Sequence, residues 1–370
     1  MNKKAILILE DQSYYTGYAL GELNKKSFGE IVFNTGLTGY QEILTDPSYA
    51  GQMVTLTYPE IGNYGINESE DNQSRQIFAA GLIIKNFSPI NSSWRGEEAN
   101  LNDFLLKYNC NGLYGVDTRQ ITRKIRSQGA MKALISTEEN CWQNDYLVKV
   151  SQELAEFPSI GEKDLASVVT CPEPYFLNHQ GTESKGLIVV LDFGLKINML
   201  NLLTQRGYDL WVLPANASFE QIKNLKPNGI FLSNGPGDPA ACLKAQETVK
   251  KLIDSGLAPI FGVCLGHQIL ALASGAKTFK LKFGHRGSNH PVKDLNNNKV
   301  YITSQNHGYA VLESSLNMDE LRITHKSLND ETIEGFEYKN KPIFSVQFHP
   351  EACPGPEETS YLFDKFASLI

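Results

Sequence analysis

Apolar and polar positions in the second half of the chain follow a regular rhythm of short buried runs and amphipathic runs. The apolar runs of strand length are "GLIVVLD" (186–192), "DLWVLP" (209–214), "GIFLS" (229–233) and "APIFGVC" (258–264). The runs between them have helical spacing and end at glycine or proline, and one of them, "SFEQIKNLKP" (218–227), also begins at a capping residue. This alternation predicts an α/β fold with an open, mostly parallel sheet and helices on both faces.

The first part of the chain has a different pattern. Helical spacing is confined to 101–108 and 119–129, and Asp117 or Thr118 could cap the second helix, which stops at Gly129. The β-like runs, separated by turn residues, are "AILILE" (5–10), "EIVFNT" (30–35), "MVTLTY" (53–58), "AAGLIIK" (79–85) and "MKALIS" (131–136). We therefore expect a smaller mixed α/β domain over 1–137, a polar, irregular linker over 138–185 and the α/β domain over 186–370.

Charge and composition exclude some classes of binding partner and favour one cellular compartment. The net charge of −7 without blocks of Lys or Arg gives no electrostatic reason to bind nucleic acid or an anionic membrane. No CxxC pair occurs among the six cysteines, which argues against a zinc ribbon or a disulfide framework and fits a reducing compartment. The apolar run in "MNKKAILILEDQ" is too short for a signal peptide, and no run approaches membrane-spanning length, so we expect a cytoplasmic protein.

Cys264 lies at the end of a predicted strand in "GVCLG" (262–266). Glycines two residues to either side are typical of a nucleophile elbow, in which a strand turns sharply into a helix. The N-terminus of that helix favours a thiolate, and the backbone N–H of Leu265 could donate to an oxyanion. A buried free thiol is the alternative for any single cysteine, but the two glycines and the strand end favour a nucleophile.

A nucleophilic cysteine needs a base, and His349 is the best candidate among seven histidines. It closes the strand-like run "PIFSVQFHPE", in which Glu351 lies two residues on and can orient the imidazole. His267 lies three residues into the helix after Cys264, so we give it a structural role. A solvated histidine and glutamate at a strand end would be the alternative interpretation of the pair.

The loop "SNGPGDP" (233–239) follows another predicted strand. Its Gly235 and Gly237 could donate backbone N–H groups to an anion, whereas a tight turn is the alternative. It lacks the lysine and hydroxyl of a nucleotide-binding loop. Neither Cys264 with His267 nor His349 with Cys353 completes a four-ligand metal site, so we expect no metal.

The motifs "GVCLGHQ", "SNGPGDP" and "FHPEA" together resemble those of class I (triad-type) glutamine amidotransferases. Residues 34–65 and 115–135, with "KFGHRGSNHPV" (282–292) and "SQNHGYAV" (304–311), resemble the small-subunit family of carbamoyl-phosphate synthases. The resemblance implies a flavodoxin-like second domain and a first domain that docks a large subunit. It also implies a catalytic triad of Cys264, His349 and Glu351 that hydrolyses L-glutamine.

The same resemblance implies that ammonia passes to a large synthetase subunit, which uses ATP, Mg²⁺ and bicarbonate to make carbamoyl phosphate for arginine and pyrimidine synthesis. No ATP-binding motif is seen in the 370 residues, so we expect the synthetase to be a separate polypeptide and this chain to hold no cofactor. The glutamine contacts that carry over are Ser48, Gly235, Gly237, Leu265, Gln268, Asn306, Gly308 and Tyr309.

Three alternative functions have features in common with this chain. An amidotransferase subunit of another synthetase, such as one that makes anthranilate, GMP or CTP, would lack "TGYQEILTDPSY" (38–49) and "DTRQITRKIR" (117–126), both of which are present. A freestanding γ-glutamyl hydrolase or cysteine peptidase would share the elbow but need no partner. A catalytically silent docking subunit would lack Cys264, His349 or Glu351.

Overall fold

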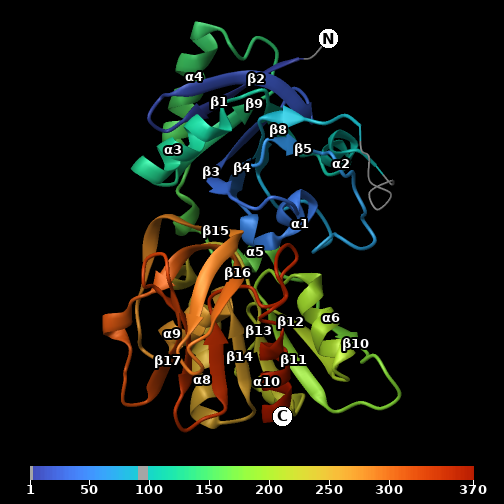
Figure 1. Ribbon diagram of the computed structural model, residues 1–370, viewed down its shortest axis with the longest axis vertical. Helices are drawn as coiled ribbons and strands as arrows, with labels where there is room; N and C mark the ends of the chain where they lie inside the picture. Colours follow the sequence, from blue (N-terminus) through green and yellow to red (C-terminus); the bar gives the residue numbers. More distant parts are fainter. Residues whose placement is uncertain (1–2, 91–98) are drawn as a thin grey trace. The chain divides into compact units, whose positions relative to one another are not determined.

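The computed structural model describes residues 3–90 and 99–370, and the chain divides into two units, Met1–Glu162 and Lys163–Ile370 (Figure 1). No helix in these described residues is long and apolar enough to cross a membrane. Each unit has its own sheet and its own hydrophobic core.

The first unit is built on a closed barrel with the strand order β1-β2-β8-β6-β4-β3-β9. Its strands are β1 (Lys4–Leu9), β2 (Tyr14–Gly21), β3 (Lys26–Asn34), β4 (Gln52–Leu56), β6 (Gly81–Ile83), β8 (Asn111–Tyr114) and β9 (Met131–Ser136). The barrel closes because β1 pairs with both β2 and β9, with Ile6 opposite Thr16 on one side and Ser136 on the other. A separate pair consists of β5 (Glu60–Ile61) and β7 (Asn86–Phe87).

A side-chain cap explains where one predicted helix of the first unit begins. The helix predicted over 119–129 is α3, and the Asp117 side chain caps it by accepting from the N–H of Gln120, while Gly129 ends it. The helices are α1 (Tyr40–Thr45), α2 (Leu101–Lys107), α3 (Thr118–Gln128) and α4 (Asn144–Glu156), with 3₁₀ turns η1 (Pro47–Tyr49) and η2 (Ile160–Glu162).

The stretch 138–185 is not the irregular linker that its polar composition suggests. Helix α4 lies within it and buries Val150 and Leu154 against Ile6, Ile8 and Leu134 of the barrel. Two apolar residues at a spacing of four suffice to attach one side of a helix, and the polar residues around them conceal it. The last part of the stretch contributes α5 (Ala166–Val169) and β10 (Tyr175–Leu177) to the second unit.

The second unit contains a 10-stranded sheet in the order β10-β12-β11-β13-β14-β19-β18-β17-β15-β16. The strands from β12 to β19 in that order pair in parallel, as the sequence predicted, and the rest pair antiparallel. They are β11 (Leu187–Asp192), β12 (Asp209–Pro214), β13 (Gly229–Leu232), β14 (Ile260–Val263), β15 (Thr278–Asp294), β16 (Val300–Val311), β17 (Leu321–Ser327), β18 (Ile333–Tyr338) and β19 (Ile343–Val346). The antiparallel half was not predicted.

Helices cover both faces of the parallel part, which confirms the predicted fold class. Successive residues of β11 enter different cores: Val189 packs with residues of α7, α8 and α9, and Val190 packs with residues of α6 and α10. The helices are α6 (Ile197–Gln205), α7 (Phe219–Asn224), α8 (Leu243–Ser255), α9 (Leu265–Ala273) and α10 (Tyr361–Leu369), with 3₁₀ turns η3 (Pro239–Ala241) and η4 (Glu313–Ser315).

Candidate active site

Cys264 occupies a sharp turn between β14 and α9. Its backbone has φ 53° and ψ −103°, which is a strained conformation for a residue with a side chain. A Cβ on Gly262 would lie 2.9 Å from the carbonyl oxygen of Gly266, and one on Gly266 would lie 2.3 Å from that of Leu232. Only glycine fits at either position, so the glycine spacing in the sequence reflects the space that the elbow needs.

His349 follows β19, the parallel neighbour of the strand that ends at Cys264. The N–H of Cys264 donates to the carbonyl of Val346, and the N–H of His349 donates to that of Ser304. His349 Nδ1 lies 2.7 Å from Glu351 Oε1, and both side chains are buried. The hydrogen bond with the carboxylate fixes the orientation of the ring and leaves Nε2 for the thiol.

Lys196, which the sequence did not single out, completes this chain of buried polar groups. Its Nζ lies 2.7 Å from Glu351 Oε1 and also donates to the carbonyl of Ala352. The side chain of Lys196 is 2% exposed, although lysine is among the residues least often buried. Lys196 is the residue before α6 and carries no motif, and only the fold shows that it meets Glu351.

Charges around the triad set its protonation. Burial alone would lower the pKa of His349, but the negative charges of Glu351 and Cys264 outweigh burial and raise the pKa to about 10. Burial would raise the pKa of Glu351, but Lys196 and His349 lower it to about 2. At neutral pH the pair is therefore an imidazolium and a carboxylate, which is the arrangement that stabilises a thiolate nearby.

Strand β16 brings several predicted glutamine contacts beside the nucleophile. The Sγ of Cys264 lies 3.7 Å from the carbonyl oxygen of Asn306, to which the thiol can donate. Gln268 donates from Nε2 to the carbonyl of Tyr309 at 2.8 Å. Gly308 lies between Asn306 and Tyr309 on the same strand, so these predicted residues form one continuous segment next to Cys264 and Gln268.

The glycine-rich loop after β13 also reaches the elbow. A Cβ on Gly235 would lie 2.2 Å from the carbonyl oxygen of Phe193 and 2.8 Å from Leu265 Cδ2. Gly237 has φ 91°, a conformation that L-residues rarely adopt. The loop thus passes against Leu265, whose N–H is the other predicted oxyanion donor.

Two predicted residues have other placements. His267 is buried and its Nδ1 lies 2.9 Å from Ser345 Oγ, while burial lowers its pKa to about 3, which fits the structural role assigned to it. Ser48 belongs to the first unit, where it lies in η1 and its N–H donates to Asp46 Oδ1. Its proposed contact with glutamine stays a prediction.

Both parts of the chain are similar to known proteins. Residues 189–369 match the family Glutamine amidotransferase class-I, and residues 7–135 match Carbamoyl-phosphate synthase small chain, CPSase domain. The carbamoyl phosphate synthase small chain of Oceanobacillus iheyensis is 50% identical over 368 residues, which cover 100% of this chain and 96% of that protein. That of Clostridium acetobutylicum is 48% identical over 366 residues, which cover 99% and 100%. A solved structure, a glutamine amidotransferase from Thermotoga maritima, has 18% identity, covers 46% of this chain and 77% of its own, and has a TM-score of 0.37.

The fold and the site together define a class I glutamine amidotransferase. The similarity to small chains extends over essentially the full length of both proteins, the first unit included. Within the amidotransferase class, the chain belongs to the carbamoyl phosphate synthase small chain family.

Proposed function

We propose that this chain is the glutamine-hydrolysing subunit of a carbamoyl phosphate synthase. The observation that carries the proposal is the placement of Cys264 on a strained elbow beside the buried pair of His349 and Glu351. A nucleophile, a base and a residue that orients the base are the parts that acyl transfer through a thioester requires.

The first half of the reaction begins with the Cys264 thiolate and the His349 imidazolium. The thiolate attacks the side-chain amide carbon of L-glutamine, and the resulting oxyanion receives N–H donors from the Gly235 loop and from Leu265. As the C–N bond breaks, His349 gives its proton to the leaving nitrogen, which departs as ammonia. In the second half, neutral His349 takes a proton from water, the hydroxide attacks the thioester, and the thiolate leaves as glutamate forms.

Glutamine recognition is assigned to residues that surround these groups. Asn306, Gly308 and Tyr309 on β16 would bind the α-amino and α-carboxylate end, and Gln268 supports that segment through the Tyr309 carbonyl. Ser48 would reach the substrate from the first unit, with Gly237 as a further backbone contact.

The partner is the large synthetase subunit, which would receive the ammonia and use ATP, Mg²⁺ and bicarbonate to form carbamoyl phosphate. The first unit is the proposed docking domain, because residues 7–135 match the family Carbamoyl-phosphate synthase small chain, CPSase domain, and lie outside the amidotransferase match. No step of glutamine hydrolysis itself requires a cofactor. The cysteines of the described residues are all free, which suits the proposed cytoplasmic location.

The test is Cys264→Ser in the reconstituted complex with the large subunit, with synthesis measured from glutamine and from ammonia. We expect glutamine-dependent synthesis to fall by roughly 10³-fold or more, because the activated nucleophile is lost, with ammonia-dependent synthesis retained. Cys110→Ala is the matched control, since that thiol lies buried in the first unit. Normal glutamine turnover by Cys264→Ser would contradict the proposal, and loss of both activities in the control would show that the assay reports folding.

A further inference from the structure

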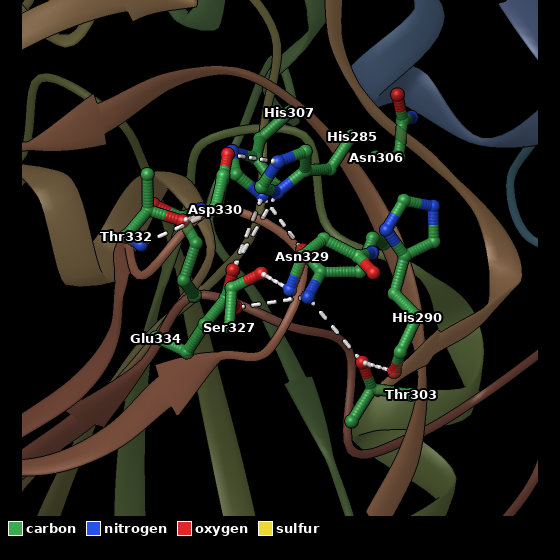
Figure 2. A network of polar contacts seen from close by, with 12 residues as sticks. His285, His290, Thr303, Asn306, His307, Ser327, Asn329, Asp330, Thr332 and Glu334 are labelled. Carbon is green, nitrogen blue, oxygen red and sulfur yellow. Dashed lines mark hydrogen bonds and ion pairs between the residues drawn. The ribbon is translucent and has the colours of Figure 1, made fainter. Parts of the chain in front are cut away.

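A second cluster of buried titratable side chains lies in the second unit, apart from the triad residues. It consists of His285 from β15, His307 from β16 and Glu334 from β18, all at most 6% exposed. His285 and His307 are direct partners in the pairing of their strands. One ligand atom of each residue lies within 4.8 Å of those of the other two, and Figure 2 shows the three side chains converging.

Each member of the cluster has one polar atom held by a neighbour outside the group. His285 Nε2 lies 2.9 Å from Asp330 Oδ2, and His307 Nδ1 lies 2.8 Å from the Tyr309 carbonyl oxygen. Glu334 Oε2 accepts from Gln305 Nε2 at 2.9 Å. A histidine that binds a metal typically donates its other N–H to a carboxylate or a backbone carbonyl, which both histidines are placed to do.

The remaining atoms of the cluster face one another at distances that suit a shared ion. Glu334 Oε1 lies 3.5 Å from His285 Nδ1 and 4.0 Å from His307 Nε2. These separations are long for hydrogen bonds, and among the described residues neither Glu334 Oε1 nor His285 Nδ1 has a hydrogen-bond partner. Ligands about 2.0–2.2 Å from a tetrahedral zinc ion lie roughly 3.3 Å from one another. The distance from Glu334 Oε1 to His285 Nδ1 is near this value, and the distance to His307 Nε2 would have to shorten when the ion binds.

The hydrogen bonds of the cluster also leave it one positively charged group short, which could be a proton or a metal ion. His307 Nε2 lies 2.6 Å from Gln305 Oε1, while its Nδ1 faces a carbonyl oxygen. Neutral imidazole has only one N–H, so one of these two contacts would join two acceptors. Rotation of the Gln305 amide moves the conflict to the Glu334 carboxylate. A cation resolves it, and the carboxylates of Asp330 and Glu334 supply two negative charges to balance a divalent one.

We propose that His285 Nδ1, His307 Nε2 and Glu334 Oε1 bind a divalent transition-metal ion, and that this ion is Zn²⁺. Two imidazoles with one carboxylate suit zinc, whereas Mg²⁺ and Ca²⁺ prefer oxygen ligands alone. The ion would hold β16 two residues from Tyr309 and so would stabilise the segment 306–309. The inference does not depend on glutamine hydrolysis.

The test begins with the full chain, stripped of metal by a chelator, incubated with excess ZnCl₂ and desalted. Elemental analysis should then find about one tightly held Zn²⁺ per chain. Glu334→Gln and His285→Asn should abolish retention, and Asp330→Asn should weaken zinc binding roughly 10–100-fold, as loss of an outer partner does. His179→Asn, which removes a histidine outside the cluster, is the matched control and should retain zinc.

X-ray absorption of the zinc-loaded natural chain decides the question even if the variants fail to fold. The expected spectrum has only nitrogen and oxygen neighbours at about 2.0–2.2 Å, whereas sulfur at about 2.3 Å would assign the ion to a cysteine and overturn the proposal. Equal zinc retention by folded Glu334→Gln and His179→Asn would overturn it too. So would a natural chain that retains no zinc, and the missing positive charge would then be a proton.

Discussion

Lys196 and Glu351 form a buried ion pair in which Lys196 Nζ lies 2.7 Å from Glu351 Oε1, with side chains 2% and 0% exposed. The same carboxylate oxygen lies 2.7 Å from His349 Nδ1, so one atom serves two positively charged partners. The lysine therefore keeps Glu351 ionised, and Glu351 keeps His349 protonated and oriented. Lys196 acts on the nucleophile through two other residues, as a positioning residue.

Replacement of Lys196 by methionine should be strongly destabilising. The variant leaves Glu351 buried with only His349 as a partner, and breaking a buried ion pair typically costs about 3–5 kcal/mol. Arg322→Met is the control, because Arg322 pairs with Glu337 at the surface and such pairs contribute at most about 1 kcal/mol. Scanning calorimetry of both variants checks the difference, and equal melting temperatures would show that the buried pair adds nothing beyond an exposed one.

His349→Asn should impair glutamine hydrolysis far more than Glu351→Gln. General acid–base catalysis contributes roughly 10²–10⁴-fold, and asparagine cannot move a proton. Glutamine at position 351 can still accept from His349 Nδ1, so part of the orientation survives. Steady-state glutaminase rates in the complex with the large subunit measure both losses, with ammonia-dependent synthesis as the control for assembly. A larger loss in Glu351→Gln would reverse the roles assigned to the two residues.

The pKa of His349 predicts the alkaline limit of the enzyme. The folded-state value of about 10 lies above the ordinary value of about 6.5, so the stabilisation from the imidazolium is fully present below pH 6.5 and is lost as the pH rises through 10. The glutaminase rate should stay constant until the pH approaches 10 and should then fall as His349 loses its proton. In Glu351→Gln the fall should move to lower pH, because the carboxylate that raises the pKa is gone. A pH–rate profile that is the same in both proteins would contradict this origin of the shift.

A glutamine-like chloroketone should alkylate Cys264 and leave Cys110 untouched. Burial raises the pKa of the Cys110 thiol to about 12, so almost no thiolate exists there at neutral pH. Cys264 instead faces a protonated imidazole at the start of a helix. Peptide mapping after limited labelling identifies the modified residue, and excess glutamine should protect it. Label on Cys110 in the folded protein would indicate that the reagent reports exposure and not an activated nucleophile.

The reactive residues of the site could be predicted from the sequence, but the buried residues that hold them in place could not. Cys264 with its two glycines, and His349 with Glu351, lie in short motifs whose local geometry follows from residue spacing. Lys196 carries no such signal, because its meeting with Glu351 depends on how two distant loops pack at the ends of β11 and β19. No sequence pattern marks Glu334 either, because the antiparallel strands that bring it to His285 and His307 were not predicted. Barrel closure through β1 and β9 likewise depends on register between distant strands.

The large subunit should control the glutaminase rate of this chain. A freestanding glutaminase would waste glutamine, because glutamine hydrolysis releases ammonia that this chain does not itself consume. The oxyanion donors provide a means of control, because a small shift of the Gly235 loop would change the distance from its N–H group to the substrate. Gly235 packs closely against Phe193 and Leu265, so a movement of either residue would move this loop. Loss of one such donor lowers the rate roughly 10²–10³-fold. We therefore expect slow hydrolysis by the isolated chain, a rise when the large subunit binds, and a further rise with ATP and bicarbonate. Gly235→Ala, in which the added methyl group must displace the loop, should remain slow with the large subunit bound. Steady-state rates that do not respond to the large subunit would show that the loop is already in its active position, and the proposed coupling would be wrong.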